Sequence, residues 1–460
     1  MMGRKDYFKK GIFIRIYLAR GWFMRRKIYR YIYNFLLPSF IMGGIIWASG
    51  CFSPQTSQKN VITVWHWMSD RQSTFEELAK KYEQETGIKV HFELFFPPGA
   101  YSQKIQAAAA ARDLPDLFGI LGEKRIIASF IKQGNIEDLT PYMEENQGEW
   151  EKRFIDISLK FNSFAEGNIY GVKPMIYAVP IDTMNIQFLF NKSLLKKIGF
   201  DTPPSNWNEF LKMGESAKDI PHTYGFVCGW GETWFLYCLV SNYAFNIMGK
   251  DKFFATLRGE IPYTDPDWIR IFSLFQEMKE RGILAVGIVT MTNKEAEQLF
   301  ANNRALFSFN GSWGVNTYRQ MNPDLQYDIM LPPPVSDKYS PRIWAGAGSS
   351  FMVNANSPRK KEAVQFLKWL TEKEQQIFLI ERTHNLPSIK GCEDKIDSNL
   401  RKFLKNMENT THPNLWPINE SSRVIEAINT GIQKILIGEK TPLEVAKEVQ
   451  KVKESTLKEK

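Results

Sequence analysis

Tryptophan is the residue type whose number and placement in this chain best suit ligand binding. Of the thirteen tryptophans, two lie within the first 50 residues. We expect four others, at helical apolar positions, to pack in the core: Trp150, Trp207, Trp268 and Trp369. A flat indole suits the apolar C–H face of a sugar, whose hydroxyls require directed hydrogen bonds. The tryptophans left open to such a role are Trp65, Trp67, Trp230, Trp234, Trp313, Trp344 and Trp416.

Nine side chains are our candidates for contacting a ligand. The stacking candidates are Trp67, Trp230, Trp313, Trp344 and Trp416. The hydrogen-bonding candidates are Asp70, Glu123, Glu232 and Asn310. Trp65 and Trp67 flank His66 at the end of a predicted strand, which is the edge where open α/β sheets bind their ligands. We expect Trp67 to face the ligand and Trp65 to face the core.

The segment from Phe300 to Tyr318 predicts how Trp313 is presented. Ala305 to Phe309 has the pattern of a short buried strand, and 310–312 has the composition of a turn with a helix N-cap. Trp313 would then fall in the first turn of the following helix.

Motifs for catalysis are not found in the sequence. It contains no Gly-x-Ser-x-Gly elbow, His-Glu-x-x-His pair, phosphate-binding loop or dinucleotide fingerprint. The five histidines are scattered without metal-ligand spacing. We therefore expect no catalytic residue, no metal and no cofactor. A glycoside hydrolase stays open as an alternative, because it also lines a cleft with tryptophans and needs only two carboxylates at a fixed separation.

The charge of the chain is concentrated in its first 50 residues. The whole chain has 59 Lys and Arg against 50 Asp and Glu, but residues 1–50 hold ten basic residues and one acidic residue, leaving 49 of each sign in the remainder. The excess is a targeting feature, and we expect no nucleic-acid partner.

Residues 1–50 resemble a secretory leader, with basic residues at 25–30 followed by the mostly apolar stretch 31–47. Met24 is the better start for such a leader. Ala48 to Cys51 resembles a lipobox, so we expect Cys51 to be acylated and 51–60 to act as a tether. An uncleaved apolar anchor is the alternative. Either case places the body outside the cytoplasmic membrane.

Three cysteines follow the leader, and none has zinc or redox spacing. We expect Cys228, Cys238 and Cys392 to be buried free thiols, with pairing of Cys228 and Cys238 as the alternative.

The elements that must position these side chains alternate between strand and helix. Strands are predicted at 61–65 and 88–94, and helices at 73–86, which Gly87 ends, and at 103–111. This alternation indicates α/β lobes with parallel sheets, and a body of about 400 residues exceeds what one core usually serves.

Several blocks of the sequence resemble extracellular solute-binding proteins of family 1, the sugar-binding components of ATP-driven importers. The segment Phe300 to Tyr318 resembles the signature of that family. Other blocks match in the same order: Gly167 to Val172, Leu189 to Leu195, Thr202 to Trp207, Lys361 to Leu370 with Gln375, and Asn385 to Ser388. The resemblance covers roughly residues 60 to 450.

The resemblance implies a two-lobed periplasmic-binding-protein type II fold with hinge crossings and a cleft between the lobes. We place the crossings near Ile181, Trp344 and Ser398. Lobe one would comprise 60–181 plus 344–398, and lobe two 182–343 plus 399–460.

The resemblance also implies a function without catalysis: capture of a carbohydrate, an oligosaccharide given the number of aromatic candidates, by hinge closure. Delivery would be to the membrane subunits of an ABC importer, and we expect the protein to be a monomer. The same fold can bind a polyol phosphate or a polyamine. Those ligands call for clustered Arg or Lys, or for several carboxylates, near the site.

Overall fold

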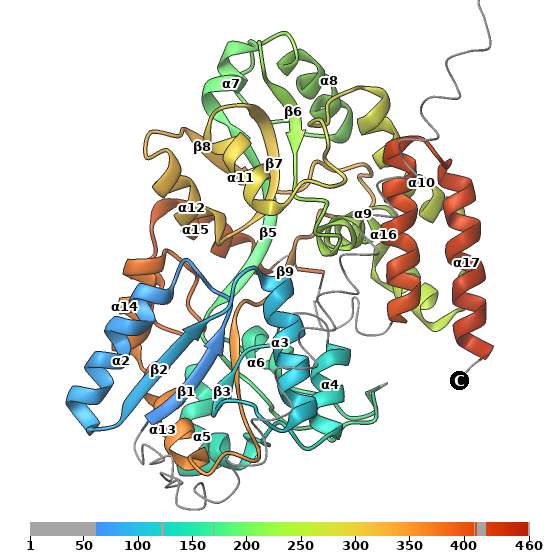
Figure 1. The fold of residues 1–460 in the computed structure, drawn as a ribbon. Helices are drawn as coiled ribbons and strands as arrows, with labels where there is room; N and C mark the ends of the chain where they lie inside the picture. The colour runs from blue at the N-terminus through green and yellow to red at the C-terminus, as the bar shows by residue number, and fades with distance from the viewer. Residues whose placement is uncertain (1–60, 121–123, 169, 409, 412–419, 459–460) are drawn as a thin grey trace, which may run out of the picture. The chain divides into compact units, whose positions relative to one another are not determined.

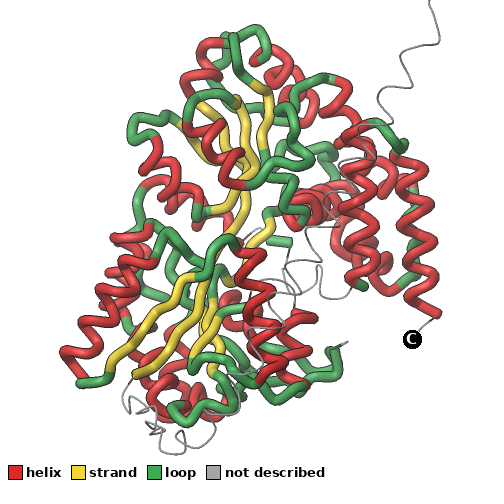
Figure 2. Tube along the Cα trace, in the orientation of Figure 1, coloured by secondary structure: helices red, strands yellow, loops and turns green. Residues whose placement is uncertain are grey.

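The computed structural model describes residues 61–120, 124–168, 170–408, 410–411 and 420–458, and its named strands form two sheets (Figures 1 and 2). In the first sheet, β1 (Val61–His66) lies between β2 (Lys89–Leu94) and β3 (Leu117–Phe118) and is parallel to both. The sheet continues with β10 (Ser350–Val353), which is antiparallel to β3, and ends with β4 (Val179–Pro180). The expected parallel pairing is therefore confirmed for its first three strands.

The second sheet is built around β5 (Thr183–Asn191), which pairs antiparallel with β7 (Ala305–Gly311), β8 (Tyr327–Met330) and β9 (Trp344–Ala347). Among the named strands of this sheet in the described part of the chain, β6 (Tyr224–Val227) and β7 are the pair that runs in parallel. The expectation of a parallel sheet is wrong here, because β5 enters directly from β4 and its neighbours run back toward that entry point.

Helices surround both sheets. Those before β5 are α2 (Gln72–Thr86), α3 (Pro98–Ala111), α4 (Lys124–Lys132), α5 (Thr140–Arg153) and α6 (Asp156–Asn162). Those between β5 and β9 are α7 (Lys192–Lys197), α8 (Trp207–Ala217), α9 (Trp234–Arg258), α10 (Pro266–Glu280), α11 (Asn293–Ala301) and α12 (Gly314–Met321). After β10 come α13 (Lys360–Leu370), α14 (Lys373–Thr383), α15 (Ser398–Lys405), α16 (Ser422–Ile437) and α17 (Pro442–Lys458).

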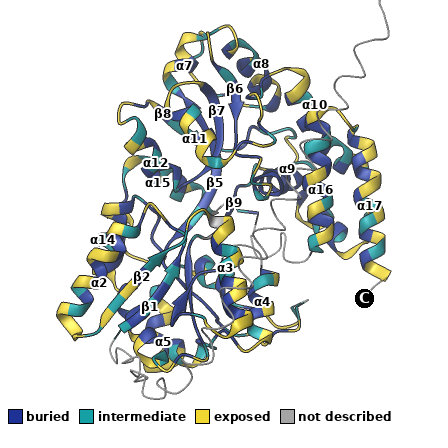
Figure 3. Cartoon of the chain, in the orientation of Figure 1, coloured by how far each residue is buried: buried dark blue, intermediate teal, exposed yellow. Residues whose placement is uncertain are grey.

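The sequence explains the first helix well. Phe75, Leu78 and Tyr82 recur at helical spacing and are buried, whereas the outward positions of α2 are exposed (Figure 3). Gly87 ends the helix with a φ of +74°, and its N–H donates to the Glu83 carbonyl. The next helix, α3, begins at Pro98 and not at the expected Gln103, because proline suits a first helical turn.

The four tryptophans expected in the core are buried, and each indole N–H has a hydrogen-bond acceptor. The acceptors of Trp150, Trp207, Trp268 and Trp369 are Thr371 Oγ1, Glu277 Oε2, Thr256 Oγ1 and Glu85 Oε2, respectively. The core interpretation of these residues is confirmed.

The described cysteines are free and buried, as expected. Burial raises the pKa of the thiols of Cys228 and Cys238, which keeps both protonated and unreactive.

Within the described part of the chain, no helix combines the length and the apolar character that crossing a membrane requires. The leader, Cys51, Glu123 and Trp416 lie outside the described residues.

Candidate functional site

The carboxyl ends of β1 and β3 meet at one edge of the first sheet, because the two strands are parallel. The Gly119 N–H donates to the Trp65 carbonyl at 3.3 Å. Tyr101 on α3 lies at the same edge: its hydroxyl donates to the Gly119 carbonyl at 2.6 Å and is also 3.0 Å from the Trp65 carbonyl. This edge presents Trp67.

The indole of Trp67 lies over Gly119. A Cβ at position 119 would meet the six-membered ring of Trp67 and would lie 3.2 Å from the Ser350 carbonyl, so only glycine leaves room for the ring. Trp67 is half-buried, with its ring centroid 5.4 Å from that of Tyr101.

The burial of Trp65 and Trp67 does not show the expected division, because both pack half-buried against the same apolar cluster. Burial alternates without a break through Met68, so both tryptophans lie half-buried on one side, and His66 is buried on the other. Trp65 is covered by Phe95, edge-on at 5.2 Å, and by the ammonium of Lys104, 4.2 Å from its ring.

Phe96 was missed by the sequence reasoning. It follows β2 at the carboxyl edge of the first sheet, the edge at which Trp67 also lies, and 64% of it is exposed. The available signal was an aromatic pair followed by two prolines just after a predicted strand.

The chain crosses between the sheets at 181–182 and again at 348–349, and one buried cluster joins both crossings. The Arg71 guanidinium forms an ion pair with Asp182 and donates to Ser349 Oγ at 3.3 Å. The Ser349 N–H donates to Asp182 Oδ1. The pKa of Arg71 is raised: burial alone would lower it, but the carboxylates of Asp182 and Asp70 outweigh that effect.

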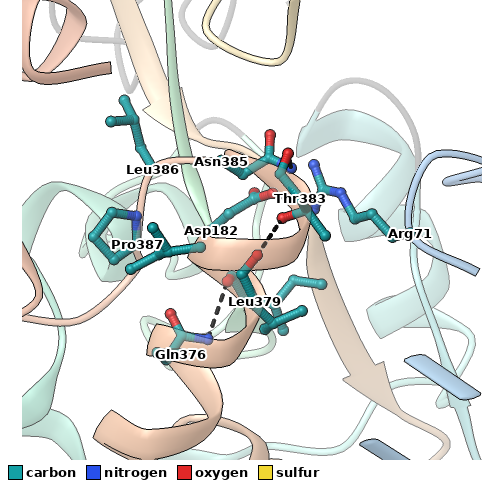
Figure 4. Close-up of a pocket in the computed structure, with 10 residues that line it drawn as sticks. Arg71, Asp182, Gln376, Leu379, Thr383, Asn385, Leu386 and Pro387 are labelled. Carbon is teal, nitrogen blue, oxygen red and sulfur yellow. Dashed lines mark hydrogen bonds and ion pairs between the residues drawn. The ribbon is translucent and has the colours of Figure 1, made fainter. Parts of the chain in front are cut away.

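A small cavity adjoins this cluster, and Figure 4 shows Arg71 and Asp182 beside Thr383 and Asn385 in its lining. Its volume of about 10 Å³ matches one water molecule and excludes a sugar. Asp70 was a candidate from its sequence context, but Arg71 and Asp182 were not, because their pairing depends on the crossing.

In the second sheet, Trp313 repeats the arrangement of Trp67. β7 extends through Gly311, so the expected turn at 310–311 is strand, and Trp313 is the N-cap residue of α12 and lies before its first turn. Its indole folds back over Gly311, where a Cβ would collide with it. The Trp313 ring is half-buried, 5.9 Å from Trp234 and 6.2 Å from Phe235.

Trp344 lies on the same face of the second sheet as the Trp313 ring. In the register, Ile186 pairs with Gly311 on one side and with Trp344 on the other, and paired residues point to the same face. Trp344 is only 5% exposed. Its indole N–H and the Ser312 hydroxyl have no hydrogen-bond partner among the described residues.

Asn310 and Glu232 are engaged within the protein. Asn310 is 1% exposed, and its amide bonds to Glu297, Tyr318 and the Gly311 N–H. Glu232 is half-buried and accepts from the Asn293 N–H at 2.8 Å and from Trp234 Nε1 at 3.4 Å.

Trp230 is 0% exposed and packs between Phe226 (5.4 Å) and Phe275 (5.6 Å). A side chain without exposed surface cannot stack on a ligand in this conformation. Asp70 is exposed, and its carboxylate lies 3.3 Å from Arg71 Nε.

The structure thus brings the candidates together at two edges. Trp67 and Asp70 lie at the carboxyl edge of the first sheet, and Trp313 and Trp344 lie where β7 and β9 pair with the start of β5. The buried Arg71–Asp182 pair links the loop after β1 to that start. Both edges therefore adjoin the crossings.

A family model described as bacterial extracellular solute-binding protein matches residues 66–377. A Brucella abortus binding protein is 25% identical over 397 residues, covering 84% of this chain and 90% of that protein. The melibiose/raffinose/stachyose-binding protein MelE of Bacillus subtilis is 23% identical over 362 residues, covering 74% of this chain and 77% of its own.

A solved structure, maltose-bound T. maritima MalE3, has a TM-score of 0.72 to this chain at 18% identity. The match covers 86% of this chain and 99% of the MalE3 chain. At this identity the likeness concerns the fold, and it confirms the expected two-lobed architecture.

Proposed function

The chain belongs to the bacterial extracellular solute-binding protein family, and on that premise we propose that it captures an oligosaccharide outside the cytoplasmic membrane and delivers it to the membrane subunits of an ABC importer. The family consists of binding proteins, so the protein performs no chemistry on its ligand. This assignment takes the place of the glycoside hydrolase alternative.

The observation that carries the proposal is the pair of indoles seated on glycines at strand ends. Trp67 lies over Gly119 and Trp313 lies over Gly311, one from each sheet, and both rings are half-buried. The exposed part of each ring is the surface that we assign to the C–H face of a sugar. The name of MelE and the maltose bound to MalE3 support a saccharide ligand.

Polar groups near the indoles would bind the sugar hydroxyls. Asp70 and Glu232 are the described groups that we assign to this role, whereas the indole N–H of Trp344 is buried and stays a candidate from the sequence. Glu123 and Trp416 remain candidates from the sequence. The burial of Trp230 and Asn310 removes them from the proposed contact surface.

Binding acts through closure of the two lobes. A ligand that contacts both indoles favours the arrangement in which both contacts exist, and hinge closure of this kind is general for periplasmic binding proteins. The closed pair of lobe surfaces is then what the importer recognises. Acylation of Cys51 would hold a monomer at the membrane, with 51–60 as the tether.

Titration calorimetry of the purified protein tests the proposal. Raffinose, stachyose and maltose are titrated alongside glycerol phosphate and spermidine, and product analysis of each saccharide mixture detects any cleavage. We expect saturable binding of at least one saccharide and no cleavage. Binding restricted to spermidine or glycerol phosphate, or turnover of a glycoside, would reject it.

A further inference from the structure

Both the NH2 group and the oxygen of the Asn310 side chain form hydrogen bonds at the end of β7. Its Nδ2 donates to Glu297 Oε1 at 3.1 Å and to the Tyr318 hydroxyl at 2.8 Å. Its Oδ1 accepts from the Gly311 N–H at 2.9 Å. Gly311 is the residue on which the Trp313 indole rests. Asn310 therefore touches the seat of Trp313 without being able to touch a ligand.

Glu297 determines which way this amide points. It lies on α11, is 3% exposed, and accepts through Oε1 from the side-chain amide of Asn293 as well, at 2.9 Å. A carboxylate only accepts, so Asn310 must present its NH2 group to Glu297 and its oxygen to Gly311. Lys294 Nζ lies 3.7 Å from Glu297 Oε2 and partly compensates the buried charge.

We propose that Asn310 and Glu297 are positioning residues that fix the Trp313 indole for ligand stacking, Glu297 acting through Asn310 and Asn310 through Gly311. The inference rests on the proposed function in that Trp313 is taken as the ligand platform. Because the network is buried and complete, it holds the platform before any ligand arrives, which reduces the entropy lost on binding.

The experiment uses the full chain labelled with 5-fluorotryptophan and ¹⁹F NMR without ligand. The Trp313→Phe variant assigns the Trp313 resonance. Asn310→Asp sets two carboxylates against each other, and we expect it to shift or broaden that resonance. Glu297→Gln alone should change little, because the amide oxygen can replace Oε1. Adding Glu297→Gln to Asn310→Asp supplies a donor opposite the new acid and should restore the resonance.

Asn302→Asp is the matched control. It makes the same chemical change at an exposed amide just after α11 and should leave the Trp313 resonance in place. An unshifted resonance in Asn310→Asp would overturn the inference, and so would a shift that Glu297→Gln does not reverse. If Asn310→Asp does not fold, the double variant decides, because a parent-like Trp313 resonance there requires the swapped pair.

Raffinose affinity separates this inference from the proposed function. We expect Asn310→Asp to weaken binding about tenfold in the parent and not at all in a Trp313→Ala background. Equal weakening in both backgrounds would contradict action through Trp313. If Trp313→Ala leaves the affinity unchanged, the platform itself is wrong, whatever the NMR spectra show.

Discussion

The guanidinium of Arg71 and the carboxylate of Asp182 form a buried ion pair between the loop after β1 and the first crossing into the second sheet. Ser349, at the return crossing, bonds to both partners. The Arg71 side chain thus bonds to both crossing segments.

Removing Arg71 should destabilise the fold strongly. Arg71→Met leaves the Asp182 carboxylate buried without its counter-ion, a change that typically costs about 3–5 kcal/mol. Urea unfolding followed by circular dichroism measures the free energy of unfolding. Arg258→Met, which breaks an exposed ion pair with Glu260, is the control and should leave that free energy unchanged. A loss of the same size in both variants would argue against a special role for the crossing.

Substitution of Trp313 should affect ligand affinity, whereas substitution of Trp230 should affect the stability of the fold. Trp313→Ala should weaken saccharide binding by about 1–3 kcal/mol with little change in the free energy of unfolding, because the ring is half-buried. Trp230→Ala should destabilise the fold by about 3–5 kcal/mol, because the ring is fully buried. Calorimetric titration and urea unfolding of both variants check this. The reverse pattern would exchange the two roles.

Gly119 and Gly311, over which the two indoles lie, should both be needed for saccharide binding. Gly311→Ala should displace the Trp313 ring and weaken saccharide binding, and Gly119→Ala should do the same through Trp67, because each new methyl group would occupy the position of the indole. Gly99→Ala is the matched control, since a Cβ there meets nothing within 4 Å. Equal affinities for all three variants would show that neither ring position matters for binding.

His66 should make the protein labile in acid. Its Nδ1 accepts from the Met68 N–H, and its Nε2 lies 2.7 Å from the Gln72 side-chain oxygen, so the buried ring is neutral with its proton on Nε2. Burial lowers the pKa of His66 from 6.5 to about 4, although the hydrogen bond with Gln72 opposes this.

The free energy of unfolding should fall as the pH falls because the unfolded chain binds this proton more tightly than the folded chain. Between pH 6.5 and 4 the unfolded chain binds a proton at His66 that the folded chain does not, so this contribution to stability is present above the unfolded pKa and is lost as pH falls. The full loss is on the order of 3 kcal/mol. Urea unfolding across this range should show a shallower pH dependence in His66→Gln than in the parent. His91→Gln, at an exposed site on β2, should retain the parent slope. An unchanged slope in His66→Gln would assign the acid lability to other groups.

Local patterns predicted the elements, and contacts distant in sequence decided the site. Periodic apolar residues and Gly87 were enough for α2, and alternation was enough for β1. Trp230 and Trp313 each follow a strand and a glycine, so the sequence could not distinguish them. The difference comes from the packing: Trp230 lies 5.6 Å from Phe275 on α10 and is fully buried, whereas Trp313 lies beside Phe235 and Trp234 and is half-buried.

The partner of Arg71 could not be predicted for the same reason. Asp182 is 111 residues away in the sequence, and only the crossing from β4 to β5 brings it to the end of β1. Parallel pairing was predicted correctly where strand and helix alternate. It was wrong where β5 enters the second sheet, because strand direction depends on the crossing and not on the composition of the strand.

The position of β10 sets an order for folding. This strand lies between β3 and β4 in the first sheet, although it follows β4 by some 170 residues of chain. β3 and β4 have no hydrogen-bonded contact within the sheet except through β10, so the first sheet stays incomplete until Ser350 to Val353 are available. A chain synthesised from its N-terminus therefore completes its first sheet only after residues 350–353 have been made.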